Sequence, residues 1–217
     1  MDAQATVSRA DLEKAWWLRA LAVFQSPRPV FAALRDDSEE GAHARQEPAL
    51  ALALLSGIAG ILATPAVDEL LDRADFDRLL VAVFVFLAGA LYGLATYWIG
   101  GGALLFGVRA AGGASSYRQT RHTLAFATAP LVLMLLIVWP LRLAMYGGDV
   151  FRKGGADEMG AARWLFAGAE LGFFAWAGVL LVLGVSALHG WPFVRSLGAV
   201  VLAILALLLF GLAFSIV

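Results

Sequence analysis

The chain has 217 residues, of which 61% are hydrophobic and only 15% are charged, and its formal net charge is −1 at pH 7. Soluble domains usually hold about 45–50% apolar and about 25% charged residues, so the composition indicates an integral membrane protein. The near-zero net charge gives no basic excess for binding nucleic acid, and the absence of cysteine excludes disulfides, thiolate catalysis and cysteine-ligated zinc.

The N-terminal stretch, residues 8–25, predicts an amphipathic helix. One face of this helix carries apolar residues at helical spacing: Leu12, Trp16, Ala20, Val23 and Phe24. The helix either lies in the membrane interface, with Trp16 and Trp17 at headgroup depth, or packs on the cytoplasmic ends of a helix bundle. Residues 35–48 then predict a solvated linker, so we assign 1–48 to a cytoplasmic N-terminal region.

Five later stretches are long and apolar enough to cross a membrane, which takes roughly 20 residues in a helix. They are residues 49–67, 79–106, 123–146, 163–188 and 193–216. The sequence therefore predicts an all-α polytopic membrane protein, in which residues 49–217 form a single domain of five transmembrane helices.

The third predicted span contains both Pro130 and Pro140. Proline removes a backbone hydrogen bond, but transmembrane helices tolerate it where threonine hydroxyls and neighbouring helices satisfy the freed carbonyl groups. Thr123 and Thr128 are placed to do so. We expect a kinked helix, with the kink serving either helix packing or a functional hinge.

Basic residues near the span ends predict the orientation, because Lys and Arg favour the cytoplasmic side. The N-terminal region, the loop between the second and third spans, and the turn between the last two spans are basic. Their basic residues are Arg9, Lys14, Arg19, Arg28, Arg35, Arg45, Arg109, Arg118, Arg121 and Arg195. Five spans then place the N-terminus in the cytoplasm and the C-terminus outside.

Glu170 is an acidic residue well inside a predicted span. A carboxylate in hydrocarbon is costly, so it must be protonated, paired or facing water. Arg142 should lie at a similar depth in the preceding span, and we predict an ion pair between them. The pair either locks two helices together or couples a proton or substrate to movement; alternatively, Arg142 extends to the lipid interface.

Pairs of glycines spaced four residues apart allow helix backbones to approach closely. Gly89 and Gly93 form such a pair in the second span, and Gly168 and Gly172 form another in the fourth. We interpret both pairs as helix-packing positions. Since Glu170 faces away from its neighbouring glycines, the fourth span should be central in the bundle.

Several basic residues fall at the predicted cytoplasmic ends of the spans and are candidates for contact with anionic lipid headgroups. They are Arg118, Arg121, His122, His189 and Arg195. Their alternative role is to set the orientation of the chain. Two histidines without nearby acids or thiols make a poor metal site, and the glycine-rich stretches lack a phosphate-loop Lys-Ser/Thr. We expect no metal, no cofactor and no enzymatic activity.

Three features in order resemble the Yip family of membrane proteins. They are the element SPRPVFAAL before the spans, the run Ala125-Phe126-Ala127-Thr128-Ala129-Pro130, and the joint containing Leu188-His189-Gly190 and Arg195-Ser196. The resemblance implies a five-helix domain with a cytosolic N-terminus. Eukaryotic members are described as interacting with Rab-type GTPases, but the Asp-Leu-x-Gly-Pro element of the Golgi members is missing, which argues against direct GTPase binding here.

The resulting prediction is a non-enzymatic scaffold or adaptor in a bacterial inner membrane. Arginine greatly outnumbers lysine, as in GC-rich bacterial genomes. The expected partners are membrane lipids, other membrane proteins or a second copy of the chain. The alternative prediction is a transporter-like or lipid-translocating protein that uses Glu170 and a cavity around the kinked third span.

Overall fold

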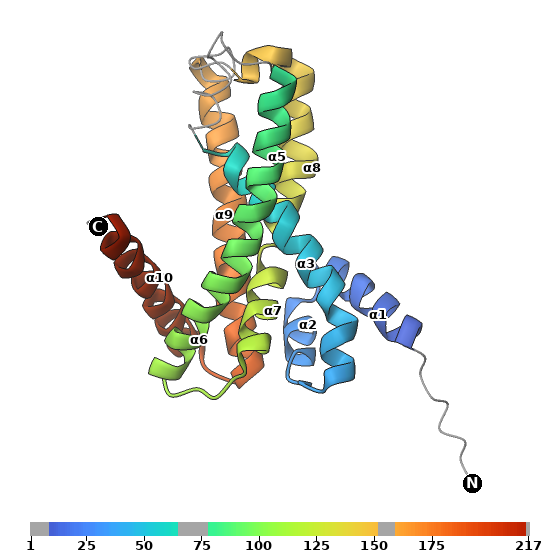
Figure 1. The fold of residues 1–217 in the computed structure, drawn as a ribbon, viewed down its shortest axis with the longest axis vertical. Coiled ribbons are helices and arrows are strands. Elements are labelled where there is room, and N and C mark those ends of the chain that lie inside the picture. Colours follow the sequence, from blue (N-terminus) through green and yellow to red (C-terminus); the bar gives the residue numbers. More distant parts are fainter. Residues whose placement is uncertain (1–8, 65–77, 152–158, 216–217) are drawn as a thin grey trace.

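The structure is a computed structural model that describes residues 9–64, 78–151 and 159–215. The regular structure in these ranges is helical throughout (Figure 1). The helices are α1 (Arg9–Ala22), α2 (Pro27–Ala33), α3 (Glu39–Leu62), α5 (Arg78–Ala95), η1 (Thr96–Gly100), α6 (Gly101–Ala110), α7 (Tyr117–Ala127), α8 (Ala129–Tyr146), η2 (Gly147–Phe151), α9 (Gly160–His189) and α10 (Phe193–Ser215).

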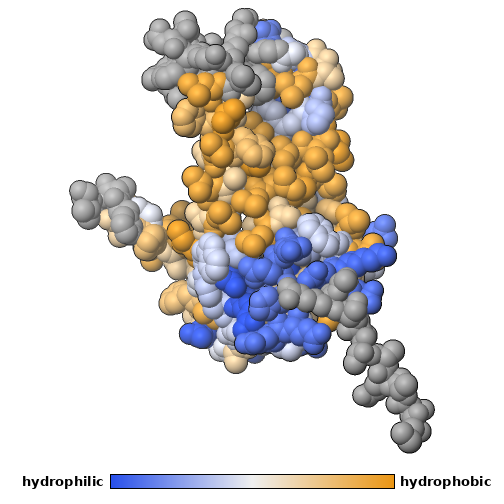
Figure 2. Space-filling view, turned by 45° about the vertical axis from the view of Figure 1, so that its right-hand side comes forward, coloured by the Kyte–Doolittle hydropathy of each residue, from blue (hydrophilic) through white to orange (hydrophobic). Residues whose placement is uncertain are grey.

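The helices form an elongated bundle with one polar end. Figure 1 shows α5, α8 and α9 running along the long axis, with α1, α2, the first half of α3, and α7 gathered at one end. On the face drawn in Figure 2, hydrophilic residues cover this end, and a broad apolar band lies above it. We call the hydrophilic region, together with the α6–α7 loop and the α9–α10 turn, the polar end.

Four helical stretches are long and apolar enough to cross a membrane: Ala82–Ala110, Tyr117–Tyr146, Gly160–His189 and Phe193–Ala213. They contain most of each of the last four predicted spans and confirm a multi-pass helical membrane protein. The first predicted span, 49–67, falls on the second half of α3, which is not among the four. Its last residues, 65–67, lie outside the described part of the chain.

The predicted linker at residues 35–48 was wrong for residues 39–48, which form the first part of α3. Ser38 begins the helix, because its hydroxyl accepts a hydrogen bond from the Gly41 N–H at 3.1 Å. Glu39 and Glu40 in the first turn stabilise the helix, because their negative charges lie at the positive end of its dipole. Pro48 lies buried inside the helix.

The third predicted span, and not the fourth, is the most enclosed helix of the bundle. In its most apolar window 56% of the residues are buried, against 33% in α9. Small side chains at Ala125, Ala127 and Ala129, all buried, let neighbouring helices pack around the α7–α8 junction. The fourth span, α9, packs on α2, α7, α8 and α10, so its central position stays a prediction although it is less enclosed.

The last helix, α10, diverges from the other apolar helices in Figure 1. Its first half packs on α6 through Ala199 and Ala203, which lie against Gly107. No residue between 204 and 213 is buried in the described structure. The distal half of α10 therefore presents apolar side chains around its whole circumference.

Helix α1 packs one face on the bundle and exposes the opposite face. Trp16 is only 3% exposed, and its ring centroid lies 5.7 Å from that of Phe126 in α7, which confirms packing on the bundle. Trp17, Leu18 and Leu21 on the other side are 44%, 60% and 69% exposed. Contact of this outer face with a membrane interface stays a prediction, compatible with the packing of the inner face.

Candidate functional site

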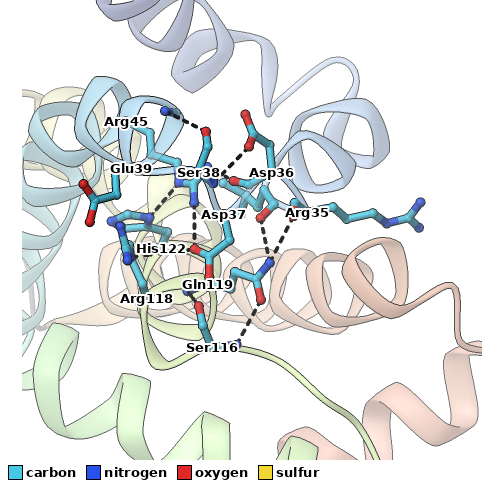
Figure 3. Close-up of polar contacts among 12 residues, drawn as sticks. Arg35, Asp36, Asp37, Ser38, Glu39, Arg45, Ser116, Arg118, Gln119 and His122 are labelled. Carbon is cyan, nitrogen blue, oxygen red and sulfur yellow. Dashed lines mark hydrogen bonds and ion pairs between the residues drawn. The ribbon is translucent and has the colours of Figure 1, made fainter.

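The most extensive polar network in the polar end is centred on Arg45 of α3, a side chain with no exposed surface. Its Nε donates a hydrogen bond to His122 Nδ1 in α7 at 2.9 Å, and His122 is also fully buried. Its Nη1 donates to the Asp36 carbonyl oxygen, and its Nη2 lies 3.4 Å from Asp37 Oδ1 (Figure 3). The guanidinium thus connects α3, α7 and the α2–α3 loop.

Asp36 and Asp37 supply the negative charge of this network. Asp37 Oδ1 also lies 3.7 Å from Arg118 Nε of α7, so one carboxylate bridges two arginines. Hydrogen bonds from the side chain and backbone of Ser38 lower the pKa of Asp36 below its ordinary value of 3.8. Burial lowers the pKa of Arg45, while the charges of Asp37 and Asp36 oppose that shift.

A second connection joins α7 to the end of α2. Ser116 and Gln119 form a capping box at the start of α7, with Gln119 N–H donating to Ser116 Oγ and Ser116 N–H donating to Gln119 Oε1. The Gln119 amide nitrogen also donates to the carbonyl oxygens of Leu34 at 3.3 Å and Arg35 at 3.2 Å (Figure 3). The same residue therefore starts α7 and holds the α2–α3 loop.

A π-helical segment, η1, interrupts the helix between α5 and α6. Two side chains of α7 bind this part of the chain: the Tyr117 hydroxyl donates to the Trp98 oxygen of η1 at 2.6 Å, and the Thr120 hydroxyl donates to the Gly101 oxygen at the start of α6 at 3.0 Å. Arg121 lies above the Trp98 ring, with its Cζ 4.2 Å from the centroid. Aromatic and hydroxyl groups thereby fix η1 against α7.

Two further arginines bind carbonyl oxygens at helix C-termini. Arg35 Nε donates to the Leu188 oxygen at 3.0 Å, and its Nη2 donates to that of Ala187, at the end of α9. Arg195 Nε and Nη2 donate to the Ala111 oxygen at 3.1 and 2.8 Å, just past α6. Cations at helix C-termini are stabilising, so these arginines have a structural role.

Arg142 and Glu170 lie together in the apolar bundle, away from the polar end. Arg142 Nη1 is 2.7 Å from Glu170 Oε1, and the side chains are 13% and 18% exposed. The guanidinium also lies over the rings of Trp139 and Phe166, at 4.9 and 5.3 Å from their centroids. The structure therefore brings together the two charged residues that the sequence placed at one depth.

The two glycine pairs differ sharply in their surroundings. Gly89 and Gly93 are buried on α5 against α3: a Cβ at Gly89 would lie 2.6 Å from the Ile58 Cα, and one at Gly93 would collide with the backbone oxygen of Ala53. A Cβ at Gly168 or Gly172 would meet no atom within 4 Å. The packing expected at Gly168 and Gly172 is therefore not made within the described chain, because α9 turns this face outward.

The prolines of the third span have different positions in α8. Pro130 lies in its first turn, directly after a break at Thr128, so α7 and α8 are two helices. The Thr128 N–H donates to the oxygens of Leu124 and Ala125, and its hydroxyl also donates to Ala125 at 2.8 Å. Pro140 lies inside α8. The kink at Pro130 is thus a complete helix break that threonine stabilises.

A model of the Yip1 domain matches residues 21–215 of the chain. The chain belongs to the Yip family. The match begins within α1 and includes every other helix named above, so the polar end and the bundle are both parts of the family domain. No curated protein and no solved structure matches the chain.

The residues predicted to contact lipid headgroups have unlike positions in this Yip protein. His122 is fully buried in the Arg45 network and cannot reach a headgroup, so that prediction was wrong. Arg118 and Arg121 are partly covered, one by Asp37 and the other by aromatic rings. Arg195 is exposed, and His189 stacks on Trp191 with ring centroids 4.6 Å apart.

Arg45 and Asp37 lie in the segment predicted as a solvated linker, where no role beyond charge was expected of them. One signal was available: Ser38 followed by Glu39 and Glu40 is a helix-start pattern. It would have extended α3 toward its N-terminus and placed Arg45 on a helix. Among the described residues of this Yip protein, no group of three His, Cys, Asp or Glu side chains is arranged to hold a metal ion.

Proposed function

We propose that this Yip protein is a membrane-embedded scaffold whose polar end faces the cytoplasm and presents a rigid surface to lipids or partner membrane proteins. The observation that carries the proposal is the buried Arg45 guanidinium, which joins α3, α7 and the α2–α3 loop. A charge buried in this way is fixed in position, because every displacement would leave it without partners. The N-terminal helices are thereby held as one body on the bundle.

The charge distribution supports the orientation in a cell inner membrane. The α6–α7 loop and the α9–α10 turn at the polar end, residues 111–116 and 190–192, contain no acidic residue. Arg109 and Arg118 flank the loop, and Arg195 follows the turn. The positive-inside rule then places the polar end in the cytoplasm. The outer face of α1 exposes Trp17 and Leu21, side chains that are suited to the headgroup region of a membrane.

Copurification from native membranes tests the scaffold role. A wild-type chain is expected to retain a reproducible set of membrane proteins or lipids, identified by mass spectrometry. The Arg45→Met variant is expected to insert into the membrane but lose that set, since the N-terminal helices are no longer fixed on α7. Retention of the same set by Arg45→Met contradicts the proposal. Loss of the set by the exposed-site control Arg28→Met alone also contradicts it.

A second candidate function is lipid translocation or transport through the bundle, and the Arg142–Glu170 pair favours it. An ion pair at 2.7 Å within apolar helices is costly to bury, and such residues often mark transport pathways. Lipid scrambling by proteoliposomes decides between the candidates. Scrambling by the wild type that falls in Glu170→Gln would support translocation, and no scrambling above protein-free vesicles would reject it.

A further inference from the structure

The turn between α9 and α10 lies between two arginines whose guanidinium groups are held in place. Arg35 contacts the end of α9 and Arg195 contacts the residue after α6, in each case through Nε and Nη2. The Nη1 of each makes no hydrogen bond to the described part of the chain, and both side chains are exposed. Each guanidinium is therefore oriented by carbonyl oxygens and keeps donors for an external acceptor.

The two arginines approach the turn from different sides, and rings line it beside Arg195. Arg195 Cζ lies 4.0 Å from the centroid of the Trp191 ring, and His189 stacks on the same indole. Arg35 Nη2 approaches to 4.0 Å of the position that a Cβ would take at Gly190. Arg35 therefore lies at the end of α9 and near Gly190, and Arg195 lies over Trp191, so both arginines border the same turn.

No acid neutralises this surface within the described residues. Neither Arg35 nor Arg195 forms an ion pair there. The nearest acids in sequence, Asp36 and Asp37, have other partners: Asp36 accepts hydrogen bonds from Ser38, and Asp37 lies between Arg45 and Arg118. The two guanidinium groups thus retain their positive charge for a ligand.

The first turn of α10 provides an apolar surface directly beside these charges. Phe193, Val194 and Leu197 are 50%, 79% and 42% exposed. A ligand that carries a phosphate and a hydrocarbon chain would satisfy both surfaces, with its phosphate at the arginines and its chain along α10. Free inorganic phosphate would use only the first of them.

From these contacts we propose a binding site for the phosphate group of an anionic lipid, formed by Arg35, His189, Trp191 and Arg195, which we call the turn site. Arginine suits this role because its planar guanidinium donates paired hydrogen bonds to phosphate oxygens. Trp191 resembles the tryptophans that lie at headgroup depth. The inference rests on the proposed membrane placement of the polar end, but not on the scaffold role.

Native mass spectrometry of the purified protein in nanodiscs tests the turn site. Discs that contain phosphatidylglycerol and phosphatidylcholine in equal parts are expected to yield wild-type protein with retained phosphatidylglycerol. Arg35→Gln/Arg195→Gln should retain about tenfold less, since two charge-assisted contacts are lost. The matched control Lys14→Gln/Arg28→Gln removes two exposed positive charges elsewhere in the polar end and should bind as the wild type does.

Pro192→Asp keeps the test decisive if the double variant does not fold. Asp is favourable at the residue before a helix, so α10 should form, but its carboxylate would repel a phosphate between the intact arginines. This variant should also lose phosphatidylglycerol. Unchanged retention by Pro192→Asp, equal loss by the control, or displacement of the lipid by millimolar inorganic phosphate would overturn the proposal. Loss of protein partners with lipid retained would reject only the scaffold role.

Discussion

Arg45 of α3 donates a hydrogen bond to His122 of α7 at 2.9 Å, and neither side chain is exposed. The two residues are 77 positions apart in the sequence. Their contact joins the first part of α3 to α7. It also explains why a polar segment rich in charge packs tightly on an apolar domain.

Loss of this contact should destabilise the protein strongly. Arg45→Met leaves His122, Asp37 and the Asp36 carbonyl without their shared partner, at a cost of about 3 kcal/mol. For a chain of this size that corresponds to a decrease of about 6–12 °C in the unfolding temperature. Thermal unfolding in one detergent measures it. Arg28→Met, at an exposed position, is the control, and equal unfolding temperatures for the two variants would reject the central role of Arg45.

The glycines of α5 and α9 should respond oppositely to a methyl group. Gly93→Ala pushes a Cβ into the backbone of α3, which should cost about 1–3 kcal/mol. Gly172→Ala meets open space, so its free energy of unfolding should stay the same or rise by up to about 1 kcal/mol through better helix propensity. Thermal unfolding of the two variants in one detergent measures the difference, with the lower unfolding temperature expected for Gly93→Ala. A larger loss at Gly172 would indicate a packing partner for α9 outside this chain.

Arg142 and Glu170 should show energetic coupling in a double-mutant cycle. Single variants Arg142→Gln and Glu170→Gln each leave a partly buried charge without this partner, whereas the double variant removes both. We expect a coupling free energy of about 1 kcal/mol or more. Unfolding of the four proteins in the same detergent provides the values. Additivity within about 0.3 kcal/mol would show that the pair does not stabilise the bundle.

The π-helical segment should depend on the hydroxyl groups of α7. Tyr117→Phe and Thr120→Val each remove a donor to a carbonyl oxygen of the α5–α6 junction, which should cost about 1 kcal/mol apiece. Tyr92→Phe removes a hydroxyl from an exposed residue of α5 and should be neutral. Unfolding temperatures below that of Tyr92→Phe are expected for both variants. A value equal to it for either one would mean that its hydroxyl is dispensable.

The sequence was sufficient for the features that depend on local composition. Long apolar runs predicted four helices that the structure contains, and depth along antiparallel helices was enough to pair Arg142 with Glu170. The break at Pro130 with help from Thr128 follows from proline chemistry. The Yip resemblance agrees with the family match over residues 21–215.

The features that were missed depend on contacts between distant segments. Arg45 looks like a solvent-exposed residue in sequence, because its partner His122 is far away along the chain. The outward rotation of Gly168 and Gly172 is set by which face of α9 packs on α8, and a glycine spacing alone cannot predict that choice. Local patterns therefore predict helices, whereas rotation and burial require the tertiary structure.

The proposed function requires that the chain crosses the membrane with its polar end in the cytoplasm. Because the chain has no cysteine, single-cysteine variants can be labelled cleanly in oriented membrane vesicles. Arg28→Cys at the polar end should react with a membrane-impermeant maleimide only from the cytoplasmic side, and Met159→Cys at the other end of α9 only from the outer side. Labelling of both positions from the same side would show that α9 does not cross the membrane and would contradict the proposed function.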